Sequence, residues 1–398
     1  MQWLQNILHC KQNSIFAYMN KYCALLMILA ATFGISGESY AQKKLIKKLF
    51  SNENDSTRSS SFVPLPAVAY SQETGLEFGV LTLYSFYSDR EDTLTRNSSI
   101  QGLATYTTQQ QINLQFKSDY WTPQNRYHIL NEIRYKDFPF SFYGIGNKTF
   151  EANNQSVVQR LFKFKAEGEK KMGRFAYTGL HLSFENHQFN YVDELNDITN
   201  PMLLRGRDGG KVLYLGLAQI IDSRNKNTYP TSGTLLKLNY SYAPELFGDE
   251  NFSGSLTKLD FRTFKALSAE TVLGFNVEYQ TLQGSNTPFY LMPQLGNDNM
   301  MRGYYTGRFR DQNLLAAQAE YRYRFHPRFG VVGFLGAGTV YSNGNMELKG
   351  VKPSYGGGFR YFFDVERGLS IRLDYGIGEK RPMEKRQSGF YVSLGESF

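Results

Sequence analysis

Apolar and polar residues alternate one by one along most of the chain from residue 62 onward. The segment 313–325 shows the pattern: its apolar positions include Ala317, Ala319, Tyr321, Tyr323 and Phe325, and its polar positions include Gln318, Glu320, Arg322 and Arg324. The same alternation recurs in the segments 232–243, 270–282 and 368–377. A period of two residues is typical of β-strands, whose successive side chains point to opposite faces of a sheet. The pattern therefore predicts an all-β fold.

The alternating segments are long enough to cross a membrane as tilted strands, which takes about ten residues. Sixteen candidate strands lie near residues 62–71, 75–87, 97–108, 111–121, 127–137, 156–168, 174–187, 210–221, 232–243, 253–265, 270–282, 313–325, 329–341, 353–363, 368–377 and 388–398. The connections at 170–173, 266–269, 326–328 and 364–367 are short, whereas those at 138–155, 188–209 and 283–312 are long. In bacterial outer-membrane barrels the short turns face the periplasm and the long loops face outward.

The two faces of these strands favour a transmembrane barrel over the alternative of a soluble β-sandwich. Strands of soluble proteins average about five or six residues, and the candidate strands here are longer. Their apolar face is rich in Tyr and Phe, and their polar face is rich in Arg, Lys, Glu and Gly. Aromatic residues make up 15% of the chain, yet the mean hydropathy is -0.43, which suits a barrel with one lipid-facing and one wet surface. We predict an antiparallel transmembrane β-barrel of about 16 strands.

The start of the chain does not share the strand pattern. An apolar run at 25–34 follows Lys21 and precedes the small-x-small sequence 39–41, which predicts a cleaved signal peptide over residues 1–41. The alternative, a membrane anchor, is disfavoured because a spanning helix needs about 20 apolar residues. The signal predicts Sec-dependent export.

Residues 42–61 are basic and then rich in Ser and Asn, and we predict that they form a disordered periplasmic lead-in. A short amphipathic helix at 43–50 is the alternative. The barrel is then expected to occupy residues 62–398.

Charge and cysteine content exclude several classes of function. The two cysteines, Cys10 and Cys23, lie within the predicted signal peptide, so the mature chain is expected to have neither disulfides nor thiolate metal sites. The net charge is +8, but the basic residues are interleaved in strands, so nucleic acid is not an expected partner. The glycine-rich run at 330–338 mimics a phosphate loop, but no helix pattern follows it. We expect neither a metal nor a cofactor.

The longest connection carries the motif Arg302-Gly303-Tyr304. A solvated loop tip is one interpretation. The interpretation we favour places the loop in the lumen, where Arg302 meets Glu320 and Asp374, two carboxylates on the polar sides of their strands. A desolvated arginine needs such partners. On this interpretation Gly303 allows a tight tip, and the run at 336–338 supplies two wall glycines that leave room for the loop.

With these motifs the chain resembles the BamA/TamA superfamily of outer-membrane barrels, also called bacterial surface antigen proteins, from about residue 62 to residue 398. The family's Arg-Gly-aromatic loop motif matches Arg302, Gly303 and Tyr304, and its acidic partner in the next strand matches Glu320. The resemblance extends to two further motifs. A typical periplasmic turn is matched by Asp222, Arg224, Pro230 and Gly233, and the C-terminal insertion signal read by assembly machinery is matched by Phe390, Val392, Leu394 and Phe398.

Two departures from the family pattern affect what can be expected. The family's Phe-x-Asp-x-Gly motif reads here as the segment 334–338 without its aspartate, so Asp374 is expected to serve as the second anchor of the loop. The lead-in is too short for even one POTRA repeat, the family's domain that receives unfolded clients. The chain therefore resembles the subgroup that lacks these repeats.

The resemblance implies a barrel that assists insertion or translocation of proteins, or of lipids, at the outer membrane through a weak seam between its first and last strands. Expected partners are outer-membrane lipid, the barrel assembly machinery for the chain's own insertion, and a periplasmic chaperone or client protein. A passive pore or structural barrel is the alternative. An enzyme is not expected, because the sequence lacks His-Glu-x-x-His and Gly-x-Ser-x-Gly motifs. His187 near Asp193 is the nearest candidate for a hydrolase at the barrel rim.

Overall fold

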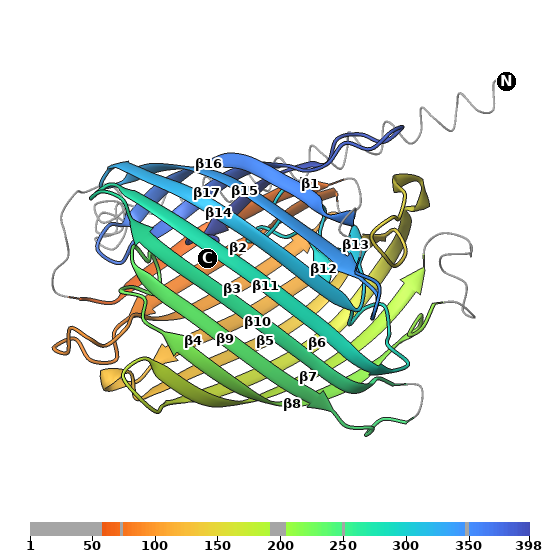
Figure 1. Ribbon diagram of the computed structural model, residues 1–398, viewed down its shortest axis with the longest axis horizontal. Helices are drawn as coiled ribbons and strands as arrows, with labels where there is room; N and C mark the ends of the chain where they lie inside the picture. Colours follow the sequence, from red (N-terminus) through yellow and green to blue (C-terminus); the bar gives the residue numbers. More distant parts are fainter. Residues whose placement is uncertain (1–57, 72–74, 192–203, 249–250, 347–349) are drawn as a thin grey trace. The chain divides into compact units, whose positions relative to one another are not determined.

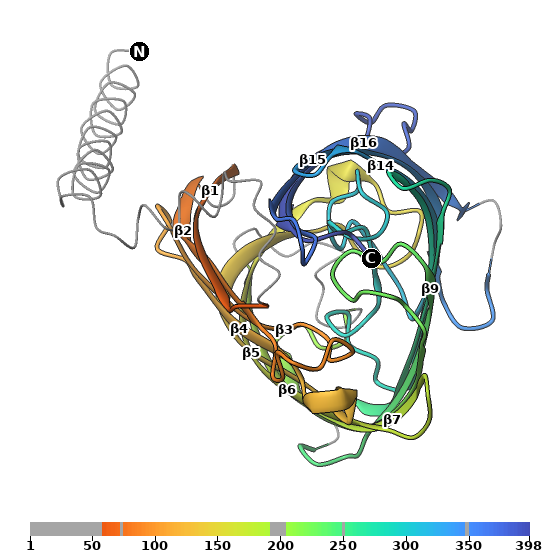
Figure 2. The same cartoon turned by 90° about the vertical axis from the view of Figure 1, so that its left-hand side faces the viewer.

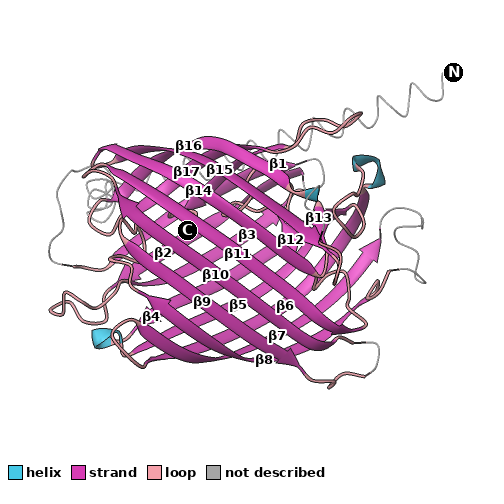
Figure 3. Ribbon diagram, in the orientation of Figure 1, coloured by secondary structure: helices cyan, strands magenta, loops and turns pink. Residues whose placement is uncertain are grey.

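Sixteen strands pair with their neighbours along the chain and form one antiparallel sheet in the computed structural model (Figures 1 and 3). The structure describes residues 58–71, 75–191, 204–248, 251–346 and 350–398. The predicted signal peptide and residues 42–57 of the predicted lead-in lie outside these residues. No helix among the described residues is both long enough and apolar enough to span a membrane.

The strands of the sheet are β1 (Ser61–Ser71), β2 (Gly75–Phe86), β3 (Ser98–Thr107), β4 (Ile112–Trp121), β5 (Tyr127–Phe142), β6 (Gln155–Lys171), β7 (Ala176–Tyr191), β8 (Gly209–Asp222), β9 (Gly233–Ala243), β10 (Ser253–Ala266), β11 (Thr271–Ser285), β14 (Asn313–His326), β15 (Phe329–Tyr341), β16 (Lys352–Asp364), β17 (Leu369–Ile377) and β18 (Ser388–Leu394). A separate two-stranded sheet consists of β12 (Gln294–Leu295) and β13 (Phe309–Arg310). Among the described residues of the connections, two single-turn 3-10 helices occur, η1 (Pro123–Asn125) and η2 (Glu151–Asn153). The prediction of an all-β barrel of about sixteen strands is confirmed.

Two groups of strand bounds differ from the prediction. β5 and β7 are longer than expected at their outward ends, where β5 pairs as far as Phe142 opposite Gln155, and β6 is longer mainly at its other end, where Lys171 pairs with Tyr177. Phe142 is fully buried in a cluster that includes Phe189 and Phe289, so apolar packing supports these extensions. The last strand is shorter than expected and ends at Leu394, because the chain turns inward at Gly395 with a φ of 77°.

The two faces of the sheet follow the predicted alternation. On β14 the side chains of Glu320 and Arg322 are buried, whereas those of Tyr321 and Tyr323 are 51% and 42% exposed. Leu335 on β15 is 66% exposed. Large apolar side chains on the outside and charged ones on the inside are expected of a barrel that faces lipid.

The two ends of the sheet are β1 and β18, and each is paired on one side only. Figure 2 looks along the barrel and shows β1 and the C-terminal strands at the two ends of the ring. The connection between β11 and β14 lies inside this ring, and it contains β12 and β13. The prediction of a long loop inserted in the lumen is confirmed.

Candidate functional site

The tip of the loop lies directly against the backbone of β17. Gly303 has a φ of 106°, and a Cβ atom there would lie 2.8 Å from the backbone of Ile377. A Cβ atom on Gly376 would lie 2.5 Å from the carbonyl carbon of Arg302. Two glycines therefore face each other at the contact, and a larger residue at either position would push the tip off the wall.

The guanidinium group of Arg302 lies between the two predicted carboxylates. Its Nη1 atom donates to Oδ2 of Asp374 at 2.5 Å, and its Nη2 atom donates to Oε1 of Glu320. All three side chains are fully buried. The ring of Phe334 lies against the guanidinium carbon at 3.6 Å and adds a cation–π contact. A buried charge in this position is stable because both carboxylates neutralise it.

Tyr304 fixes the loop to the strands beside the tip. Its hydroxyl group donates to the carbonyl oxygen of Pro353 at 2.6 Å and accepts from the main-chain N–H of Glu379 at 2.8 Å. The hydroxyl group of Tyr391 on β18 accepts from the N–H of Gly303 at 2.9 Å. The tip is thus held from β16, from the β17–β18 connection and from β18.

The pair of carboxylates belongs to a larger cluster of charges that is buried except for Asp298, whose side chain is 43% exposed. Four arginines meet four carboxylates through the ion pairs Arg302–Glu320, Arg302–Asp374, Arg322–Glu320, Arg360–Asp374, Arg360–Glu396 and Arg372–Asp298. The cluster is therefore electrically balanced, and it joins the loop to the walls formed by β14, β16 and β17.

The residues after β18 also enter this cluster, which the sequence did not predict. The Glu396 carboxylate accepts from Nε of Arg360 at 2.9 Å, and Ser397 donates to Glu320 at 2.5 Å. Burial alone would raise the pKa of Glu396, but the guanidinium groups of Arg360 and Arg322 outweigh it and lower that pKa. Residues 395–398, here called the tail, therefore form part of the plug inside the barrel.

The structure separates the predicted C-terminal signal residues. Phe390 and Val392 point outward and are 65% and 64% exposed, and Leu394 is partly buried at the end of β18. Phe398 instead lies in the lumen, where its ring packs against Phe264 with 5.8 Å between centroids. The outward apolar stripe of the last strand therefore ends before Phe398.

The predicted periplasmic turn contains a chelated carboxylate. Asp222 accepts from Nε and Nη2 of Arg224 at 3.0 and 2.9 Å, and it forms an ion pair with Arg96 from the β2–β3 connection. Gly233 has a φ of 96°, and a Cβ atom there would lie 2.3 Å from the carbonyl oxygen of Ser223. Pro230 is buried in the same turn.

This turn also reaches the connection between β16 and β17. Lys226 donates to the carbonyl oxygen of Glu366 at 3.1 Å, and Thr228 donates to that of Arg367. Arg367 in turn donates to the carbonyl oxygen of Ser59, just before β1. The residues 223–232 therefore connect strands near both ends of the sheet, and we call them the bridging turn.

The remaining candidates do not assemble into a catalytic or metal site in the described part of the chain. His187 contacts Glu185 at 3.0 Å and Gln159 at 3.1 Å, and its ring stacks on Tyr290. Asp193, its suggested partner, lies outside the described residues. Within the described residues no three His, Cys, Asp or Glu side chains are placed to hold a metal.

The sequence analysis correctly predicted that the loop residues lie together in the lumen, but it did not predict every residue of the charge cluster. Gly338 lies opposite the loop, since a Cβ atom there would meet Leu295 and Met301, whereas Gly336 packs against Ala317 of the neighbouring strand. Arg322 and Arg372 could have been predicted as members of the charge cluster, because both lie on the polar side of their strands. Glu396 stands on the apolar side of the last strand's alternation, and this break in the pattern was the one signal that could have marked it.

A family model described as the Omp85 superfamily domain matches residues 93–398. None of the curated proteins matches the chain.

Several solved structures share the fold. A BamA structure from Haemophilus ducreyi, which lacks POTRA domains 1-3, is 12% identical with a TM-score of 0.52, and the match covers 85% of this chain and 70% of that one. CdiB from Acinetobacter baumannii is 11% identical with a TM-score of 0.51, covering 86% of this chain and 66% of that one. CdiB from Escherichia coli is 10% identical with a TM-score of 0.55, covering 85% and 62%. The chain thus spans about two thirds of the length of these structures.

Proposed function

The chain belongs to the Omp85 superfamily of outer-membrane barrels, and from this premise we propose that it opens between β1 and β18 to assist proteins, or lipids, into or across the outer membrane. The observation that carries the proposal is the strand order, which begins at β1 and ends at β18 without a register between them among the described residues. An unpaired strand edge can template an incoming strand.

The two edge strands support this proposal. β18 has seven residues and is the shortest strand of the large sheet, so few hydrogen bonds hold it to β17. β1 contains Pro64 and Pro66, which lack main-chain N–H groups. Because the two prolines are two residues apart, both missing donors belong to one edge of β1, and proline within sheets is found at free edges.

The docked loop and tail favour this function over a passive pore. Arg302, Tyr304 and Phe398 occupy the interior and are almost completely buried. A steady open channel would require both segments to leave. Planar-bilayer recordings that show large and steady conductance would therefore support the pore instead.

The test is client insertion in liposomes with the seam free or locked. Phe62 on β1 and Val392 on β18 both face outward near the same end of the barrel, and the barrel residues contain no native cysteine. Cysteines at these positions, joined by a short bifunctional maleimide, are expected to abolish any acceleration of insertion over empty liposomes. A cysteine pair at Leu373 and Val392, which are register partners within one hairpin, is the control and should leave the acceleration intact. No acceleration by the unmodified barrel, with or without periplasmic extract, would reject the proposal.

Export and partners belong to the same proposal. Residues 1–41 direct Sec-dependent export, and residues 42–61 lead into the barrel. The assembly machinery inserts the barrel, and a periplasmic chaperone delivers its clients. Amino-terminal sequencing of the protein from outer membranes should begin at Gln42, and affinity purification with the barrel as bait tests the partners.

A further inference from the structure

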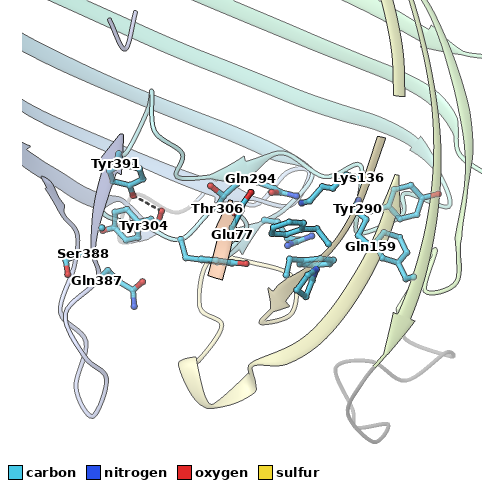
Figure 4. A pocket seen from close by; sticks show the side chains of 17 residues that line it. Glu77, Lys136, Gln159, Tyr290, Gln294, Tyr304, Thr306, Gln387, Ser388 and Tyr391 are labelled. Atoms are coloured by element: carbon cyan, nitrogen blue, oxygen red, sulfur yellow. Dashed lines mark hydrogen bonds between the residues drawn. The ribbon is translucent and has the colours of Figure 1, made fainter. Parts of the chain in front are cut away.

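A cavity of about 560 Å³ lies in the lumen at the end of the barrel that holds the long loops (Figure 4). Its wall includes Lys136 on β5 and Gln159 on β6, and the docked loop contributes Arg310. Glu77 on β2 and Gln387 beside β18 also line it. The cavity therefore adjoins strands at both ends of the sheet.

Arg310 is a buried cation without a carboxylate partner among the described residues. Its side chain is 2% exposed, and its Nε and Nη2 atoms donate to the carbonyl oxygen of Gly307 at 3.3 and 3.2 Å. The rings of Phe142, Phe140 and Phe289 lie 5.1, 5.4 and 5.6 Å from its guanidinium carbon. The Nη1 atom has no hydrogen-bond partner in the part of the chain that the structure describes.

The absence of a carboxylate partner distinguishes Arg310 from the other two buried arginines of the loop. Arg302 forms ion pairs with two carboxylates, and Arg308 forms one with Glu384 at 3.4 Å. A buried charge is costly unless it is paired, because burial removes its hydration. For the same reason burial lowers the pKa of Arg310 to about 10, so the group remains charged at neutral pH.

The charges around the cavity add to a positive balance. Lys136 forms no ion pair with a described residue, and Glu77 is the single carboxylate among the lining residues. Two cations thus face one carboxylate, and the cavity attracts an anion.

The rest of the wall combines aromatic rings with neutral hydrogen-bonding groups. Tyr304, Tyr305 and Tyr391 supply rings, while Gln159 and Gln387 supply amides. Aromatic faces stack on the apolar faces of sugar rings, and amides can both donate to and accept from hydroxyl groups. This combination suits a ligand that is polar around its edge and flat on its face.

We propose that this cavity binds a phosphorylated sugar, with the phosphate held by Arg310 and Lys136 and the sugar ring placed against the tyrosines. Such a group exists free in solution or as the headgroup of an anionic glycolipid. Because the lining includes residues beside both ends of the sheet, a headgroup carried by a lipid can enter from the bilayer. The site rests on the cavity alone and does not require the insertion activity proposed above.

Binding is tested with the full barrel in detergent by isothermal titration with glucosamine 1-phosphate, glucosamine and inorganic phosphate. We expect glucosamine 1-phosphate to bind at least about ten times more tightly than glucosamine, because its phosphate adds charge-assisted contacts to Arg310 and Lys136. A second arm uses native mass spectrometry of barrels in nanodiscs with a diphosphorylated glucosamine-disaccharide glycolipid. Retention of this lipid over phosphatidylglycerol, without binding of the soluble sugar, would assign the site to the lipid headgroup.

Arg310→Gln is expected to weaken binding about tenfold or more, and Lys136→Gln several-fold. Lys117→Gln removes a cation on the neighbouring strand β4 that does not line the cavity, and it should change the affinity less than about twofold. Heat-modifiable gel mobility establishes that each variant is folded. Equal binding of glucosamine and its phosphate, no binding of any phosphorylated probe, or full affinity in folded Arg310→Gln would each overturn the proposal.

Discussion

The hydroxyl group of Ser397 donates a hydrogen bond of 2.5 Å to Oε1 of Glu320, the same oxygen that accepts from Nη2 of Arg302. The tail and the tip of the loop therefore share one buried acceptor. If either segment left the lumen, the buried carboxylate of Glu320 would lose a hydrogen-bond partner. Each segment therefore stabilises the docked position of the other. The plug of the barrel is one connected unit rather than a loop alone.

Arg302→Ala should release the loop. The change leaves the carboxylates of Glu320 and Asp374 buried without their shared partner, and removal of one member of such a pair costs about 3–5 kcal/mol. We expect a lower yield of folded barrel by heat-modifiable gel mobility and faster proteolysis within 286–312. Arg386→Ala, at an exposed arginine of the β17–β18 connection, is the control. Unchanged mobility and unchanged protection in Arg302→Ala would remove the role assigned to this residue.

Phe398→Ala and Phe390→Ala should have different effects, although both residues belong to the predicted C-terminal signal. Phe398 is 5% exposed and packs against Phe264 and beneath Arg322, so its truncation should cost about 3 kcal/mol and loosen the tail. Phe390 faces outward, so its truncation should slow membrane insertion and leave the plug protected. Protease protection of the loop and the rate of assembly into liposomes separate the two effects. Identical behaviour of the two variants would contradict the inward position of Phe398.

The docked tail should tolerate mild acid. The pKa of Glu396 is lowered in the folded state, so its contribution to stability is complete above its ordinary value of 4.5 and is lost as the pH falls below it. Proteolysis of the tail and loop should therefore be the same at pH 7 and pH 5.5 and should increase only in more acidic solution. In Glu396→Gln the acid-dependent step should shrink. Release of the tail between pH 7 and pH 5.5 would show that Arg360 and Arg322 do not hold the carboxylate as described.

Alternation of side chains was sufficient to predict most of the barrel. A strand with one face in lipid must place every second residue outward, so the pattern reports both the strands and their inward residues, including Glu320 and Asp374. Arg302 was placed beside them for a different reason, because an arginine on a loop that folds into the lumen needs carboxylate partners. The docked loop was thus predicted from its own motif together with the carboxylates on the wall.

The tail could not be predicted in this way. Phe398 falls on the same face as Phe390, Val392 and Leu394, and the predicted strand was therefore continued to residue 398 across Glu396. Gly395 breaks the strand at a positive φ, and the arginines inside the barrel then attract Glu396. Such an attraction depends on tertiary contacts that no local pattern records. The extended outward ends of β5 and β7 were missed for a related reason, since packing against the loop supports them.

The bridging turn should be sensitive to a single change at Asp222. Asp222→Asn removes the charge that Arg96 and Arg224 share, and hydrogen bonds to charged groups contribute about 1.5–3 kcal/mol. Because the turn links β8 and β9 to the β16–β17 connection, and Arg367 continues the link to Ser59 before β1, we expect looser anchoring of both ends of the sheet. Faster proteolysis within 223–232 and a lower melting temperature should report it.

Asp208→Asn provides the matched comparison for Asp222→Asn. Asp208 forms an ion pair with Arg207 in the β7–β8 connection, but its side chain is 87% exposed, so the loss should be at most about 1 kcal/mol. The two substitutions are chemically identical. The two sites differ in the burial of the carboxylate and in the number of arginines that pair with it. A larger drop in melting temperature for Asp222→Asn, together with cleavage confined to the bridging turn, is the expected result. Equal and small effects of the two substitutions would mean that the bridging turn does not stabilise the two ends of the sheet. The stability of the junction between β1 and β18 would then depend on those two strands alone.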